Sequence, residues 1–168
     1  MSPPNEAELA RLGARLGDAL RTHHWRLATA ESSTGGLIGH AITMTPRASD
    51  YYAGGVICYS NLAKEVALGV PHALIEAHGA VSEEVAAALA AGAAHRFETD
   101  LGISVTGIAG PEGGSDRKPV GTHYIGVVRR GHPARVEHHV FSHDREGNQA
   151  AAAMAALELA LDEVLAAA

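Results

Sequence analysis

The most informative segment of this 168-residue chain is Leu27-Ala28-Thr29-Ala30-Glu31-Ser32-Ser33-Thr34-Gly35-Gly36. Its first four residues form a short strand-like run, and the paired glycines allow a tight turn. The apolar residues that follow, from Leu37 to Met44, recur at helical spacing and stop before Pro46, where a helix is expected to end. The segment is therefore predicted to be a strand, a loop and a helix in direct succession.

The regions on either side continue the alternation of helices and strands. Before this segment, leucines at helical spacing follow a candidate cap formed by Asn5 and Glu8, so the chain opens with an amphipathic helix. After it, we predict strands over residues 51–59, 101–106, 122–128 and 135–141, and helices over residues 61–68, after Ser82 and from about residue 144. The last two strands are expected to form an antiparallel hairpin. This order predicts an α/β fold, a three-layer α/β/α domain with a mixed, partly parallel sheet.

Length and composition limit the kind of protein. The 168 residues fit one domain, residues 1–168, and no apolar run reaches the roughly 18 residues that a membrane span requires. The first residues lack the basic and apolar regions of a secretory signal, so we expect a cytoplasmic protein with no membrane partner. A formal net charge of -6, without a face rich in Lys and Arg, argues against nucleic acid as a partner.

The sequence gives little support for a metal centre. The single cysteine, Cys58, excludes an internal disulfide and a Cys-rich zinc site. Eleven histidines are present but no HExxH pair, and His138 and His139 stand side by side in a predicted strand, where they face opposite ways. We therefore predict no bound metal and no cofactor.

Two glycine-rich segments, residues 31–36 and 107–118, follow predicted strands. Loops beyond the carboxyl ends of strands form the ligand crevice of open α/β sheets, so both segments are expected to line one pocket. Ser32, Ser33 and Thr34 lie at a helix start, where free N–H groups can stabilise an oxyanion or bind phosphate. The alternative, which spacing alone favours, is that Ser33 or Thr34 is an N-cap and the glycines allow tight packing.

A serine nucleophile needs a base, and the candidate is Lys64. It lies in an apolar turn between Leu62-Ala63 and Val66-Ala67, where burial would lower its pKa and allow it to take a proton from serine. The pattern alone favours another interpretation, in which Lys64 is an exposed helix lysine paired with Glu65 or Glu31.

Two further features are open to two interpretations each. Residues 110–118 could wrap a phosphate, with Arg117 or Lys118 neutralising its charge, or could form a mobile surface loop. Glu31, beside Ser32, could orient a substrate amide or ribose, or could form an ion pair.

Four longer motifs occur in order along the chain. They are Thr29-Ala30-Glu31-Ser32-Ser33-Thr34-Gly35-Gly36, Tyr59-Ser60-Asn61-Leu62-Ala63-Lys64, His78-Gly79-Ala80-Val81-Ser82-Glu83 and Gly107-Ile108-Ala109-Gly110-Pro111-Glu112-Gly113-Gly114-Ser115. Together they resemble the CinA C-terminal domain family, and the resemblance runs from the first helix to about Arg145. Members of this family include the bacterial nicotinamide mononucleotide deamidase, which releases ammonia to give nicotinic acid mononucleotide in pyridine-nucleotide salvage.

The resemblance implies a reaction and a set of site residues. The family's reaction is assigned to a Ser/Lys dyad, and the matching residues are Ser32 and Lys64. Lys64 would deprotonate Ser32, which attacks the carboxamide carbon while N–H groups near residues 34–36 hold the oxyanion. A pyridine nucleotide as substrate and a homodimer are also implied. The implied substrate-binding residues are Glu31, Thr34, Gly35, Gly36, Tyr59, Asn61, Thr106, Gly107, Gly110, Pro111, Gly113, Gly114, Ser115 and Lys118.

Two departures from the family pattern bear on function. Ser33 stands where the family usually has Cys, and residues 146–151 replace a segment in which relatives commonly carry further Arg and Gln. If that segment helps to bind substrate, activity or specificity is altered. Two alternatives therefore stay open, a non-catalytic nucleotide-binding or regulatory module linked to competence or DNA damage, and a hydrolase of another amide or of a phosphoester.

Overall fold

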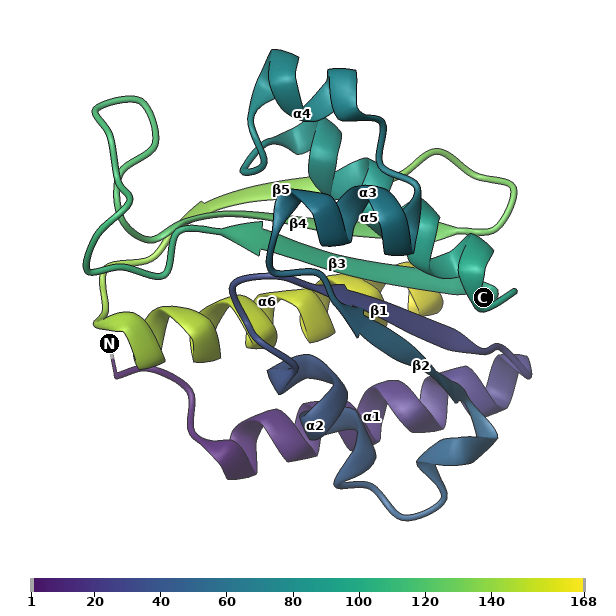
Figure 1. Ribbon diagram of the computed structural model, residues 1–168. Helices are drawn as coiled ribbons and strands as arrows, with labels where there is room; N and C mark the ends of the chain where they lie inside the picture. The colour runs from purple at the N-terminus through teal and green to yellow at the C-terminus, as the bar shows by residue number, and fades with distance from the viewer. Residues whose placement is uncertain (1, 168) are drawn as a thin grey trace.

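A mixed β-sheet forms the middle layer of the structure, a computed structural model that describes residues 2–167 (Figure 1). Within that range, five strands lie in the order β2-β1-β3-β4-β5. The strands are β1 (Leu27–Glu31), β2 (Tyr52–Ile57), β3 (Leu101–Gly107), β4 (Thr122–Arg129) and β5 (Arg135–Val140). Strands β2, β1 and β3 run parallel, whereas β4 is antiparallel to β3 and β5 is antiparallel to β4. The predicted mixed, partly parallel sheet is confirmed.

Helices cover both faces of this sheet (Figure 1). Below the sheet in this view lie α1 (Glu6–His23), α2 (Leu37–Thr43) and α6 (Arg145–Ala166). Above it lie α3 (Asn61–Leu68), α4 (His72–His78) and α5 (Glu83–Arg96). The predicted three-layer α/β/α arrangement is therefore confirmed. Two short elements are missing from the prediction, namely α4 and a single 3-10 turn, η1 (Ala48–Asp50), that leads into β2.

Helix α1 forms as predicted, because both its start and its inner face are specified locally. The side chain of Asn5 accepts the N–H of Glu8 at 3.0 Å, and the side chain of Glu8 accepts the N–H of Asn5 at 2.8 Å. These two bonds complete a capping box. The inner face buries leucines at helical spacing, namely Leu9, Leu12, Leu16 and Leu20.

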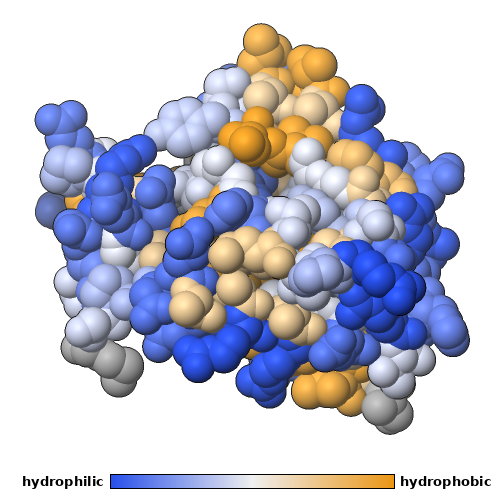
Figure 2. Space-filling model, turned by 90° about the horizontal axis from the view of Figure 1, so that it is seen from below, coloured by the Kyte–Doolittle hydropathy of each residue, from blue (hydrophilic) through white to orange (hydrophobic). Residues whose placement is uncertain are grey.

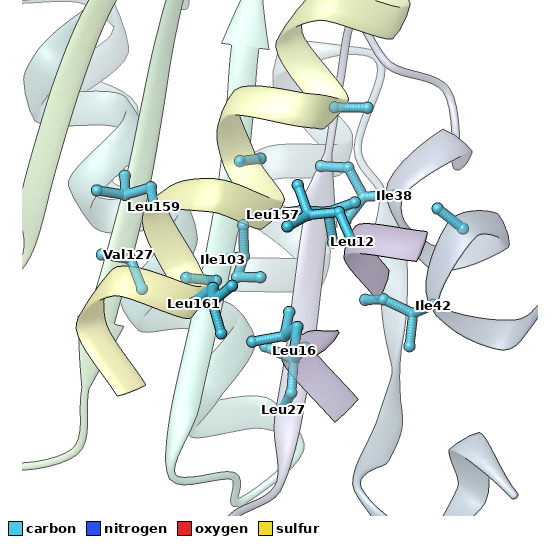
Figure 3. Close-up of a cluster of buried hydrophobic side chains, with 14 of the residues drawn as sticks. Leu12, Leu16, Leu27, Ile38, Ile42, Ile103, Val127, Leu157, Leu159 and Leu161 are labelled. Carbon is cyan, nitrogen blue, oxygen red and sulfur yellow. The ribbon is translucent and has the colours of Figure 1, made fainter. Parts of the chain in front are cut away.

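The larger hydrophobic core lies between the sheet and the layer of α1, α2 and α6 (Figure 3). In it, buried side chains come from all three helices and from the central strands. They include Leu12, Leu16, Ile38, Ile103 and Leu157. Truncation of one such side chain to alanine typically costs about 2–5 kcal/mol, so this core fixes the position of α6 relative to the sheet.

On the other face, α5 packs very closely against the sheet, because small residues meet there. A Cβ atom added to Gly102 of β3 would collide with the carbonyl oxygen of Ala90 in α5. Val85 and Leu89 of α5 belong to the smaller core that fills the remaining space. This packing holds α5 against β1 and β3, the two strands after which the glycine-rich segments begin.

The outer face of the α1, α2 and α6 layer carries a mixed surface. Figure 2, seen from below the view of Figure 1, shows hydrophilic residues over much of this face with hydrophobic residues scattered among them. Within residues 2–167, no helix has both the length and the apolar character needed to cross a membrane.

Candidate active site

Ser32 and Lys64 meet in the structure, although they lie on different elements. Ser32 directly follows β1, and Lys64 lies on α3. The Nζ atom of Lys64 lies 3.1 Å from the Oγ atom of Ser32 and 2.8 Å from the carbonyl oxygen of Cys58. Lys64 is 2% exposed and Ser32 is 7% exposed. The two groups are thus within hydrogen-bonding distance and shielded from water, as a serine nucleophile and its base require.

Helix α3 buries Lys64 together with Leu68 and exposes two other large apolar residues, which departs from the usual pattern. Ser60 caps the helix by accepting the N–H of Ala63 at 3.1 Å, which sets where the helix begins. Lys64 then falls on the inner face, whereas Leu62 and Val66 are 67% and 75% exposed. A helix selected for packing alone would bury the leucine and the valine. The buried lysine therefore points to a chemical role.

Burial lowers the pKa of the Lys64 amine below its usual value, because desolvation disfavours the charged form. No carboxylate of the described residues forms an ion pair with it: Glu65 instead contacts His72 at 2.8 Å, and Glu31 is bound elsewhere. The interpretation of Lys64 as an exposed, ion-paired lysine is therefore wrong. A lowered pKa increases the neutral fraction of the amine, which is the form that accepts a proton from serine.

The carboxylate of Glu31 caps the amino end of α2. It accepts hydrogen bonds from the Thr34 hydroxyl at 2.7 Å and from the N–H groups of Gly36 at 3.1 Å, Ile38 at 3.0 Å and Gly39 at 2.8 Å. Glu31 is 2% exposed, so these bonds replace the water that the charge would otherwise need. The negative charge also lies at the positive end of the helix dipole, which favours it.

This arrangement corrects two expectations. Neither Ser33 nor Thr34 is the N-cap of α2, because Gly36 precedes the first helical residue and the capping group is the side chain of Glu31. Glu31 also does not reach the pocket beside Ser32. It instead lines a separate, smaller cavity of about 160 Å³, together with residues of β2 and α2.

The expected oxyanion donors change as well. The N–H of Gly36 is bound to the capping carboxylate, and the N–H of Gly35 donates to the Ser32 carbonyl oxygen at 3.1 Å. The N–H groups of Ser33 and Thr34 make no hydrogen bond with another described residue. The free donors near the nucleophile therefore lie at residues 33 and 34, before the two glycines.

A pocket of about 260 Å³ opens beside the dyad. It is lined by Ser32, Ser33, Tyr59, Asn61, Lys64, Ala80, Val81, Thr106, Gly107, Ala109 and Arg145. The structure thus brings together the sequence-predicted residues Ser32, Lys64, Tyr59, Asn61, Thr106 and Gly107. Nowhere in residues 2–167 do three His, Cys, Asp or Glu side chains gather closely enough to hold a metal ion.

Most of the second glycine-rich segment lies outside this pocket. Residues 111–117 are exposed, and the Nζ atom of Lys118 donates to the His78 carbonyl oxygen at 3.0 Å. A turn closed by Ser115 and Lys118 shapes the tip of the loop. The predicted binding residues that the structure does not bring to the pocket are Glu31, Thr34, Gly35, Gly36, Gly110, Pro111, Gly113, Gly114, Ser115 and Lys118.

Arg145 lines the pocket and is a site residue that the sequence motifs do not predict. It is the first residue of α6, and it donates from Nη1 to the Gly110 carbonyl oxygen and from Nη2 to the Tyr59 hydroxyl, at 2.6 and 3.1 Å. The side chain thereby links the second glycine-rich segment to the pocket wall. One signal could have found it: a cation in the first turn of a helix faces the positive end of the dipole, which other contacts must offset.

The following turn of α6 holds both loops at the pocket. Asn148, which is fully buried, donates from Nδ2 to the Ala109 carbonyl oxygen at 3.0 Å. Gln149 donates from Nε2 to the Ser33 carbonyl oxygen at 2.9 Å. The segment that departs from the family pattern thus supports the backbone beside the nucleophile.

Comparison with known sequences gives one family over nearly the whole chain. The model of the CinA C-terminal domain matches residues 9–164. A nicotinamide-nucleotide amidohydrolase of Enterobacter agglomerans is 41% identical over 161 residues, covering 96% of this chain and 98% of that protein. A CinA-like protein of Salinibacter ruber is 49% identical over 147 residues, covering 88% of this chain and 35% of that protein. The chain spans only about 22–35% of the first curated relatives that it matches.

Solved structures share the same fold. A CinA superfamily protein from Klebsiella pneumoniae matches with a TM-score of 0.90 at 32% identity, covering 94% of this chain and 98% of that chain. A competence/damage inducible protein from Agrobacterium tumefaciens matches with a TM-score of 0.89 at 33% identity, covering 96% and 99%. The likeness therefore extends over nearly the whole chain.

Proposed function

The chain belongs to the CinA C-terminal domain family, and from this premise we propose that it hydrolyses the carboxamide of nicotinamide mononucleotide to nicotinic acid mononucleotide and ammonia. The observation that carries the proposal is the buried contact of 3.1 Å between Lys64 Nζ and Ser32 Oγ, with no carboxylate paired to the lysine among the described residues. The full-length relative named as a nicotinamide-nucleotide amidohydrolase supports the choice of substrate.

The proposed reaction proceeds through an ester on Ser32. Neutral Lys64 takes the hydroxyl proton as Oγ forms a bond to the carboxamide carbon, and the carbonyl electron pair moves onto oxygen. When the C=O bond forms again, the C–N bond breaks and ammonia leaves with the proton from the Lys64 ammonium. Neutral Lys64 then takes a proton from water, whose oxygen attacks the ester. The departing Ser32 oxygen receives that proton, which restores the free enzyme.

Arg145 is the proposed anchor for the phosphate of the substrate. The cationic residues that line the pocket are Lys64 and Arg145, and Lys64 is committed to Ser32. The guanidinium of Arg145 is a cation that presents several donors, which suits a phosphate. The pyridine ring would lie beside the dyad, between Tyr59 and Thr106, and the ribose would extend toward Arg145. In this proposal, residues 110–118 form the outer edge of the phosphate site.

The test is direct measurement of both products, ammonia and nicotinic acid mononucleotide, from nicotinamide mononucleotide. Ser32→Ala and Lys64→Ala should each lower kcat/KM by at least about a thousandfold, because each removes one half of the dyad. Ser49→Ala, at an exposed serine outside the pocket, is the matched control and should keep full activity. Full activity in Ser32→Ala would disprove the mechanism. Tight binding of the nucleotide without ammonia release by the wild type would instead indicate a non-catalytic binding module.

A further inference from the structure

Ser33 carries a buried hydroxyl that bonds to none of the residues that the structure describes. The residue lines the catalytic pocket next to the nucleophile and is only 5% exposed. Its Oγ atom has no hydrogen-bond partner among the described residues. The other buried side-chain atoms without a hydrogen-bond partner among the described residues belong to Tyr51, His123 and Arg129. None of these residues lines the pocket.

An unpaired buried hydroxyl lowers the stability of a fold, so its presence calls for an explanation. A structural serine at such a site usually has a partner, as Ser104 does: its Oγ donates to the Ala86 carbonyl oxygen at 2.6 Å. A hydroxyl that binds no protein group loses no bond when it rotates about χ1. Ser33 can therefore turn its hydroxyl toward a ligand at little cost.

The same loop lacks the oxyanion donors that a helix start usually supplies. The N–H groups of Gly36, Ile38 and Gly39 are bound to the Glu31 carboxylate. A negative charge in that position also cancels the positive end of the α2 dipole. A developing oxyanion beside Ser32 must therefore be stabilised by other groups.

The backbone around Ser33 is held rigidly enough to serve this purpose. The Ser32 carbonyl oxygen accepts the N–H of Gly35 at 3.1 Å, and the Ser33 carbonyl oxygen accepts Nε2 of Gln149 at 2.9 Å. Because each peptide group is planar, these bonds also fix the direction of the N–H groups of Ser33 and Thr34. Preorganised donors of this kind need no rearrangement during the reaction.

We propose that Ser33 is a catalytic residue, which stabilises the oxyanion through its hydroxyl and its backbone N–H. The inference rests on the proposed amide hydrolysis. As Ser32 Oγ bonds to the carboxamide carbon, the carbonyl electron pair moves to oxygen, and Ser33 donates both hydrogen bonds to that oxygen. When the C=O bond forms again, the C–N bond breaks and ammonia leaves with the proton held by Lys64. Ser33 itself is neither protonated nor deprotonated in this cycle.

The decisive variant is Ser33→Ala, which removes the hydroxyl and keeps the backbone N–H. Its kcat for nicotinamide mononucleotide should fall by about 10²- to 10³-fold, the usual effect of losing one oxyanion donor, with little change in KM. Its Tm should equal or exceed that of the wild type, because an unpaired hydroxyl has been removed. Ser33→Cys, whose thiol is a weaker donor, should have a kcat between that of Ser33→Ala and that of the wild type.

The matched control is Ser104→Ala, which removes a buried hydroxyl that does have a partner. This variant should lose stability and keep its kcat, the opposite of Ser33→Ala. A Ser33→Ala protein that keeps the wild-type kcat would overturn the inference. So would one that unfolds or loses as much stability as Ser104→Ala, because the hydroxyl would then be structural.

A second measurement separates this inference from the choice of substrate. An alkyl fluorophosphonate labels a serine nucleophile and places a phosphoryl oxygen where the oxyanion would lie. In Ser33→Ala, the reagent should label Ser32 at least about tenfold more slowly than in the wild type. This factor is smaller than the usual loss of kcat when one oxyanion donor is removed. If nicotinamide mononucleotide is not hydrolysed but labelling slows, the proposed function fails and the role of Ser33 stands. Equal labelling rates would refute the role of Ser33 whatever the substrate.

Discussion

The two glycine-rich segments begin at neighbouring strand ends, but they use their glycines differently. In residues 31–36 the chain turns around a buried carboxylate, with left-handed φ values of 61° at Gly35 and 106° at Gly36. In residues 107–118 most side chains face solvent, and Gly107 and Ala109 reach the pocket. The first segment is a rigid part of the reaction centre, whereas the second forms its outer edge.

The difference shows what glycine richness does and does not indicate. Glycine permits a tight turn in both segments. A loop is held in a single conformation only where a buried polar group forms hydrogen bonds to its backbone. Glu31 provides that group in the first segment, and no described residue does so at the tip of the second. The two lysines of the chain differ in the same way. Lys64 contacts Ser32 in the first segment, whereas Lys118 belongs to the second segment and donates to the His78 carbonyl oxygen.

The largest expected difference between the segments concerns these lysines. Lys64→Met should abolish turnover, by at least about a thousandfold, and should raise stability at neutral pH because it no longer buries an ionisable amine. Lys118→Met is the matched control and should keep kcat within about twofold, because it changes an exposed loop outside the pocket. Kinetic assays and urea unfolding measure both. Equal losses of kcat in the two variants would contradict the assignment of the base.

The same pair of variants tests the pKa of Lys64. Because burial lowers it, the unfolded chain binds more protons than the folded chain between the lowered pKa and the ordinary value of 10.5. The stability of the wild type should therefore rise with pH across that window, relative to Lys64→Met, and kcat should rise as the amine loses its proton. A kcat that falls across this window would be inconsistent with Lys64 as a base.

A smaller effect is expected from removing the capping carboxylate. Glu31→Ala leaves three N–H groups and the Thr34 hydroxyl without their acceptor, so the free energy of unfolding should drop by about 3 kcal/mol or more. Glu112→Ala, at an exposed position in the second segment, should change it by less than about 0.5 kcal/mol. Urea unfolding of both variants gives the comparison. A loss below about 1 kcal/mol in Glu31→Ala would mean that the loop tolerates loss of its cap.

The smallest effect concerns Arg145, which links the second segment to the pocket wall at Tyr59. Arg145→Ala should raise KM for nicotinamide mononucleotide about tenfold, equivalent to about 1.4 kcal/mol of binding, while kcat changes less. Arg145→Lys should recover part of the loss, because a lysine keeps the charge but not the paired donors. Arg15→Ala, at an exposed arginine of α1 outside the pocket, is the control. If KM is unchanged in Arg145→Ala, the phosphate site lies elsewhere.

Much of the fold follows from local sequence, and the exceptions have physical causes. The five strands and the helices α1, α2, α3, α5 and α6 are all recognisable from apolar spacing and caps. Helix α4 is not, because it has only seven residues and begins after Pro71 without a side-chain cap. Strand β2 ends at Ile57, before the predicted limit at Tyr59, and Tyr59 lies in the pocket wall.

The candidate site is less visible in the sequence, because burial of a polar residue has no local signature. Lys64 follows the pattern of an exposed helix residue, and only the ordered motifs indicated its pairing with Ser32. The pairing of Arg145 with Tyr59 has no local sign in the sequence, because the two residues lie 86 positions apart. The position of Glu31 beside the nucleophile suggests a substrate ligand, but its carboxylate instead caps the amino end of α2.

The contacts of α6 also have a consequence for the order of events during synthesis. Ser32 and Lys64 leave the ribosome well before Arg145, Asn148 and Gln149, which hold Gly110, Ala109 and Ser33 in place. A chain that stops before Arg145 therefore lacks the groups that hold Gly110, Ala109 and Ser33, and the pocket is complete only once α6 has been made.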